Sequence, residues 1–209
     1  MKKLLSLVLA LLLVLSFAGC SGSTAITEAN VTATVDSAFD ALKRFDTKKL
    51  EKYVDSKTLS VIITYANKHD QFADLGKALF KNLEYSIESI DLDAKTVTVS
   101  VRNKDLKDTA SAFTKALVSK YSALQMLSLL NNETWLNTSL NSLTDSIAIA
   151  KMQSAPVSVT LTVTAGKKNL MLGFDDTAEN AVSGGALQAV KSLTSGLTGS
   201  KSTTESTSN

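Results

Sequence analysis

Two stretches of alternating apolar and polar residues constrain the fold of this chain most strongly. Residues 85–101 (YSIESIDLDAKTVTVSV) alternate on both sides of turn residues at 91–95, and residues 157–174 alternate around a second turn at 165–168. Alternation with a period of two between turn residues is typical of β-hairpins that bury one face. The sequence therefore predicts a curved antiparallel sheet built from two β-hairpins.

One face of this sheet is expected to line the core. The inward positions are Tyr85, Ile87, Val97, Val99, Val101, Val159, Leu161 and Val163. General acid-base catalysis needs a titratable group whose pKa is tuned by burial beside a partner, and Tyr85 carries the only hydroxyl in this set. We therefore expect no catalytic dyad on this face, and we interpret Tyr85 as a candidate ligand contact or as the donor of a buried hydrogen bond.

Helical spacing of apolar residues characterises the N-terminal segments. Residues 31–45 carry one apolar stripe, with Thr27 or Asn30 as the candidate cap, and Asp46 is the candidate cap of a second helix up to residue 55. Residues 59–68 combine helical spacing with a β-branched run. Helix is the favoured interpretation of that stretch, and strand is the alternative.

A long helical stretch separates the two predicted hairpins. Apolar stripes at 106–127 and 136–150, with the turn sequence NNET between them, predict an αα-hairpin. The predicted fold class is therefore α+β, with N-terminal helices, a curved antiparallel sheet from two β-hairpins and a long αα-hairpin inserted between them.

The N-terminal residues indicate where the protein is located. Lys2 and Lys3, an aliphatic run and the small residues before Cys20 are typical of a signal peptide. The stretch also resembles the bacterial lipoprotein signal, in which the cysteine receives a lipid and becomes the new N-terminus; Phe17 stands where that family usually has Leu. The alternatives are a secreted protein with one unpaired thiol and a membrane-spanning anchor. We expect lipidation at Cys20 and a location on the outer face of the bacterial cell membrane.

Composition divides the chain into four parts. We expect a signal peptide at 1–19, a lipidated tether at 20–26, one α+β domain at 27–193 and a disordered Ser/Thr-rich tail at 194–209. Without the two lysines of the signal, the 22 basic residues fall to 20, against 20 acidic ones. This balance leaves no basic stripe for nucleic acid, which we do not expect as a partner.

The order of the predicted elements resembles a known group of proteins. The segments FDALKRFDTKKLEKYVD, YSIESIDLDAKTVTVSV and VSVTLTVTAGKKNLMLGFDDTAENAVSGG are similar to small Gram-positive lipoproteins of unknown function with a nuclear-transport-factor-like, or cystatin-like, α+β cone. The resemblance covers residues 28–190 and implies a cone-shaped fold, which houses isomerases and dehydratases in other proteins. Relatives of this kind commonly carry an aromatic residue in the last strand, where this chain has residues 170–172.

Few residues have the pattern of a chemical site. Trp135, which opens the helix predicted at 136–150, is a second candidate ligand contact, and packing at the helix end is the alternative. We expect His69 at a surface loop or helix end. The aspartates at 91, 93, 175 and 176 are interpreted as turn and cap residues, and Gly184-Gly185 as a helix stop. One cysteine and one histidine predict no metal site, and we expect no cofactor.

These observations predict a binding protein more strongly than an enzyme. We expect a non-enzymatic interaction module of the cell envelope, held on the membrane by an N-terminal lipid, with a small apolar ligand, a peptide or an envelope protein as its partner. The alternative is a small pocket enzyme of the isomerase or hydrolase type on the same cone fold.

Overall fold

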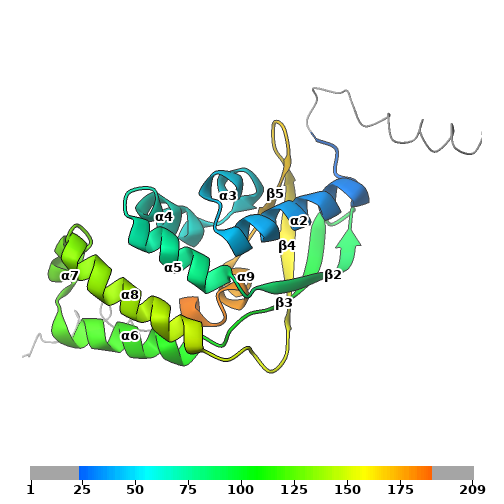
Figure 1. The fold of residues 1–209 in the computed structure, drawn as a ribbon. Coiled ribbons are helices and arrows are strands. Elements are labelled where there is room, and N and C mark those ends of the chain that lie inside the picture. Colours follow the sequence, from blue (N-terminus) through cyan, green and yellow to red (C-terminus); the bar gives the residue numbers. More distant parts are fainter. Residues whose placement is uncertain (1–23, 190–209) are drawn as a thin grey trace, which may run out of the picture.

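The structure of this protein is a computed structural model that describes residues 24–189. Its helices are α2 (Glu28–Arg44), α3 (Thr47–Tyr53), α4 (Lys57–Ala66), α5 (Asp70–Phe80), α6 (Lys107–Lys120), α7 (Ala123–Leu129), α8 (Glu133–Ile149) and α9 (Asp176–Val182). Its strands are β1 (Val54–Asp55), β2 (Glu84–Asp91), β3 (Thr96–Arg102), β4 (Val157–Ala165) and β5 (Leu170–Gly173). The α+β class predicted from the sequence is confirmed. Figure 1 shows α2 lying across the sheet, while α6, α7 and α8, which we call the arm, extend to one side.

The sheet is mixed, with the strand order β1-β5-β4-β3-β2. Neighbouring strands from β2 to β5 pair antiparallel, but β1 pairs parallel to β5, with Val54 opposite Leu172. The prediction of a wholly antiparallel sheet was therefore wrong. After α3 the chain runs extended for two residues, and the carbonyl of Asp55 accepts a bond from the amide of Phe174. A strand of two residues is too short to show alternation, so nothing in the sequence predicted β1.

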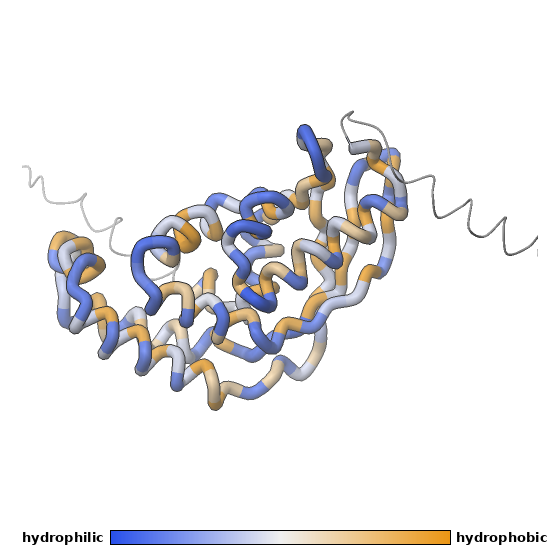
Figure 2. Tube along the Cα trace, turned by 45° about the horizontal axis from the view of Figure 1, so that its top comes forward, coloured by the Kyte–Doolittle hydropathy of each residue, from blue (hydrophilic) through white to orange (hydrophobic). Residues whose placement is uncertain are grey.

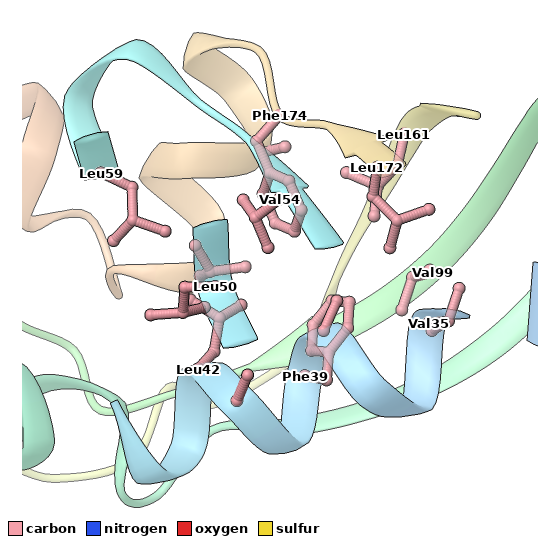
Figure 3. Close-up of a cluster of buried hydrophobic side chains, with 14 of the residues drawn as sticks. Val35, Phe39, Leu42, Leu50, Val54, Leu59, Val99, Leu161, Leu172 and Phe174 are labelled. Carbon is pink, nitrogen blue, oxygen red and sulfur yellow. The ribbon is translucent and has the colours of Figure 1, made fainter. Parts of the chain in front are cut away.

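The inner face of the sheet packs against α2. Val97, Val99, Val101, Val159, Leu161 and Val163 are all buried, as the alternation predicted. Phe39 on α2 lies among them and among residues of β5, where Leu172 is also buried (Figure 3). Tyr85 and Ile87 are only half-buried, since β2 is the edge strand. The fully buried inner positions therefore belong to β3, β4 and β5, while Tyr85 and Ile87 of β2 pack against the same core and stay partly exposed.

Polar caps fix the ends of the N-terminal helices. Thr27 and Asp46 accept backbone amides at the starts of α2 and α3, so both cap predictions are confirmed, the first in favour of Thr27 over Asn30. Ser56 caps α4, which confirms helix over strand for that segment. We made no prediction for α5, although Phe72 and Phe80 mark its apolar side. Gly76 lies on α5 against the ring of Phe45. An added Cβ would come within 2.5 Å of that ring, so a larger residue does not fit there.

The arm differs from the predicted αα-hairpin. The first stripe breaks at Tyr121, and Ser122 starts the separate helix α7 by a capping box with Gln125. Leu124 and Leu127, which we expected to continue the buried stripe, are 81% and 60% exposed. The capping box needs only Ser122 and Gln125, so it can separate two helices while the apolar spacing of the sequence continues. The spacing therefore gave no sign of the break.

The arm joins the rest of the domain through a buried asparagine. The side-chain amide of Asn103 donates to the carbonyls of Leu79, at the end of α5, and Val182, at the end of α9. Gly184, with φ of 62°, follows α9 and confirms the predicted helix stop; its carbonyl accepts the amide of Leu106, just before α6. The ends of α5, β3 and α9 thus meet at the root of the arm.

Candidate functional site

A recess lined by aromatic residues lies in the arm, between α6 and α8. It has a volume of about 270 Å³ and is open to solvent. Its lining includes Phe113, Leu117 and Tyr121 from the α6 side, and Trp135 with three small polar residues, Thr138, Ser139 and Ser142, from α8. We call this recess the arm groove. An apolar floor with a few hydroxyl groups is the usual lining of a binding site for a small molecule or a peptide side chain.

A helix cap places Trp135 in the arm groove. The side-chain oxygen of Asn132 accepts the backbone amide of Trp135 at 3.0 Å, so α8 starts at Glu133 and Trp135 lies in its first turn. The indole packs edge-on against Tyr121, with a centroid distance of 6.3 Å. The Nζ atom of Lys120 lies over the Tyr121 ring, 5.4 Å from its centroid. The groove end near α7 therefore combines two aromatic rings with one cation.

Polar contacts hold the start of α8 against α5. His69 Nδ1 donates to Glu133 Oε1 at 2.9 Å, and Gln71 donates to the other carboxylate oxygen at 3.0 Å. Gln71 also donates to Asn137 at 2.7 Å. The hydrogen bonds from His69 and Gln71 lower the pKa of Glu133 below its ordinary value. His69 stands at the N-cap position of α5, so the prediction of a helix-end histidine is confirmed.

A second, much smaller cavity lies inside the domain. It measures about 50 Å³ and is walled by apolar residues of α4, α5 and α9, together with Leu42, Val54 and Phe174. The buried Glu179 reaches it, accepting a bond from Ser56 Oγ and the amide of Thr58 at 3.3 Å. Because Ser56 also caps α4, this carboxylate extends the cap and ties α9 to the start of α4. Ligand pockets commonly hold about 300–1,000 Å³, so in this conformation the cavity is too small for a substrate.

Tyr85 lies apart from both cavities. Its hydroxyl donates to Asp36 Oδ1 at 2.9 Å, and its ring stacks on Phe39 with a centroid distance of 4.4 Å. Partial burial and then the bond to Asp36 raise the pKa of Tyr85 to about 12. Since Tyr85 lines neither the arm groove nor the internal cavity, the structure brings the two candidate ligand contacts, Tyr85 and Trp135, to different places.

Two of the four predicted turn and cap aspartates, Asp91 and Asp175, make the expected bonds. Asp91 accepts the amide of Ala94 at 2.8 Å in the β2–β3 turn, and Asp175 accepts the amide of Ala178 at 2.8 Å as the cap of α9. Asp55, Asp175 and Asp176 lie with Lys57 along an open recess of about 580 Å³ that residues of β4 also line. Among the described residues, no group of three or more His, Cys, Asp or Glu side chains is arranged to hold a metal ion.

Sequence reasoning missed the groove as a site. The apolar stripe predicted at 106–127 includes Phe113, Leu117 and Tyr121, and all three are only half-buried. The signal that could have found the groove is the presence of three aromatic residues, Phe113, Tyr121 and Trp135, on two successive amphipathic segments. Aromatic residues are enriched in protein–protein interfaces relative to the rest of the surface.

Comparisons with known proteins add no identity. No protein-family model matches the chain, and no curated protein or solved structure is significantly similar to it. None of the helices between residues 24 and 189 is long and apolar enough to cross a membrane. Cys20, the predicted signal peptide and the predicted tail lie outside the described residues.

Proposed function

We propose that this chain is a lipid-anchored lipoprotein on the outer face of a bacterial cell membrane, where it acts as a binding module and not as an enzyme. The observation that carries the binding function is the arm groove, where Phe113, Leu117, Tyr121 and Trp135 expose apolar surface between two helices. The lipid anchor rests on the order of residues before Cys20. The cone assignment belongs to the same proposal and is supported by a sheet with α2 across one face.

The partner in this proposal is an apolar segment of a peptide or an envelope protein, or a small apolar ligand. The groove offers one cation, Lys120, and hydroxyl groups at Thr138 and Ser139, but its floor is aromatic and aliphatic. Binding of apolar groups to such a floor releases water from both surfaces, which is the main favourable contribution to association. The small internal cavity is also apolar, but at about 50 Å³ it has no room for such a partner.

Fluorescence energy transfer can test the groove directly, because Trp135 is the only tryptophan of the chain. The probe is 1-anilinonaphthalene-8-sulfonate, an apolar anionic dye. We expect its binding to quench Trp135 emission and Phe113→Glu to abolish the transfer, whereas Val61→Glu, on the exposed side of α4, should leave it unchanged. Equal transfer in the wild type and in Phe113→Glu would show that the dye binds elsewhere and would refute the groove as an apolar site.

Replacing the cysteine tests the anchor separately. We expect Cys20→Ser to remain unprocessed or to be released from the cell, because serine offers no sulfur for the lipid. The measurement is the distribution of the protein between membrane and medium, together with its mass. Mature Cys20→Ser protein that stays on the membrane as efficiently as the wild type would contradict lipidation.

A pocket enzyme of the isomerase or hydrolase type is the second candidate, and the buried pair Ser56–Glu179 is the observation that favours it. A hydroxyl that donates to a buried carboxylate inside an apolar cavity is a recognised arrangement for nucleophilic or acid-base chemistry. Its test is turnover of p-nitrophenyl esters. Hydrolysis by the wild type that disappears in both Ser56→Ala and Glu179→Gln, with folding retained, would favour the enzyme over the binding module.

A further inference from the structure

Most of α6 and all of α7 have an uneven charge, although the predicted mature chain is balanced overall. Residues 109–132 include Lys115 and Lys120 and no aspartate or glutamate. Both lysines are exposed on α6. The nearest carboxylate after this segment, Glu133, is engaged by His69 and Gln71 from α5. The segment therefore carries two positive charges and contains no acidic residue between Asp108 and Glu133.

An apolar helix forms the end of the same segment. α7 carries no charged residue, and Leu124 and Leu127, three positions apart on one face, are 81% and 60% exposed. The hydropathy colouring of Figure 2 shows apolar residues continuing to this outer end of the arm. Neither leucine lines the arm groove. We call Leu124, Leu127, Lys115 and Lys120 the arm tip.

We propose that the arm tip docks onto an anionic lipid surface. The chemistry on both sides is complementary: the leucines enter the boundary between headgroups and acyl chains, and the lysines face the negatively charged headgroups. Amphipathic helices with basic flanks bind such surfaces in this way, and aromatic residues are enriched at the same depth. Tyr121 and Trp135 stand next to the tip and supply those rings.

The position of the tip gives the docked protein an orientation. In Figure 1 the start of α2, which follows the predicted lipid anchor, and α7 lie at opposite ends of the molecule. One contact at each end lays the domain along the membrane instead of letting it stand upright. Burial of apolar residues and attraction between lysines and anionic headgroups at the tip add to the attachment that the lipid provides.

Quenching of Trp135 by bromine-labelled acyl chains measures whether the tip reaches the lipid. The whole processed protein is incorporated into vesicles of phosphatidylcholine, with or without phosphatidylglycerol. We expect quenching only with phosphatidylglycerol, and a fall to the level of neutral vesicles in Leu124→Asp/Leu127→Asp. Each of Lys115→Gln and Lys120→Gln should lower the ratio of docked to free tip about fivefold, the effect of one basic residue near a charged membrane.

Two further variants make the result decisive. Val61→Asp introduces the same charge on α4, where Val61 is 57% exposed, and should quench like the wild type. Ser128→Trp with Trp135→Phe moves the only tryptophan onto α7 itself and should be quenched more strongly. Absence of quenching from both tryptophan positions overturns the proposal. So does association into a dimer that is lost in Leu124→Asp/Leu127→Asp without lipid contact, because the occupant would then be a second copy.

Discussion

The sheet with α2 and the arm are stabilised by different means, although both were predicted from apolar periodicity. The sheet, α2 and α9 share one continuous cluster of buried residues that includes Phe39, Leu161 and Leu172. The buried residues of the arm, among them Leu136 and Leu140, are outside that cluster. Periodicity identifies a face that can be buried, but it does not say how much of the face a neighbouring element covers.

The largest expected difference between the two regions is the cost of removing a leucine. Leu161 is fully buried, so Leu161→Ala leaves a cavity and should lower the free energy of unfolding by about 3 kcal/mol. Leu127→Ala on the exposed face of α7 should change it by less than about 0.5 kcal/mol. Urea denaturation of both variants measures this difference. Equal destabilisation would mean that the arm tip is covered in solution.

A smaller effect is expected where the regions meet. Asn103→Ala removes both donors to the carbonyls of Leu79 and Val182, and leaving buried acceptors without partners should cost about 1–3 kcal/mol. Asn141→Ala, on an exposed position of α8, is the matched control and should be nearly neutral. If Asn103→Ala is as stable as the control, then Asn103 does not hold the arm to the domain.

Acid should loosen the start of the arm before the sheet. Since the pKa of Glu133 is lowered in the folded chain, its contacts contribute above its ordinary value of 4.5 and are lost as the pH falls through the lowered value. The protection factors for hydrogen exchange at the first turn of α8 should therefore fall in acid, while those of β4 stay high. Glu133→Gln should remove this acid dependence, and Asp145→Asn, further along α8, should retain it.

The smallest effect concerns the edge of the sheet and appears at high pH. The pKa of Tyr85 is raised to about 12 from 10.0, so the bond to Asp36 contributes below pH 10 and is lost as the pH rises toward 12. The four tyrosines can be titrated together by phenolate absorbance. Tyr85→Phe should remove the component that ionises at the highest pH. Tyr121→Phe, in the arm, should leave that component in place; its loss there would contradict the assignment.

The sequence by itself determined the elements whose signal is local. The alternation around Val99 and Leu161 predicted the buried face of β3 and β4, and Asp46 and Asp175 marked helix starts because a carboxylate caps the free amides of the next turn. These patterns depend on neighbours within a few positions along the chain. The lipidation of Cys20 also rests on local pattern alone and stays a prediction.

Tertiary structure alone decided which predicted faces are covered. The stripe through Phe113, Tyr121 and Leu124 has one period in the sequence, but the structure divides it into a groove wall and an exposed tip. The two-residue strand β1, the contacts of Asn103 and the bond from Ser56 to Glu179 join residues that are distant in the chain. Such pairings depend on the packing of whole elements against one another, and no pattern of neighbouring residues encodes them.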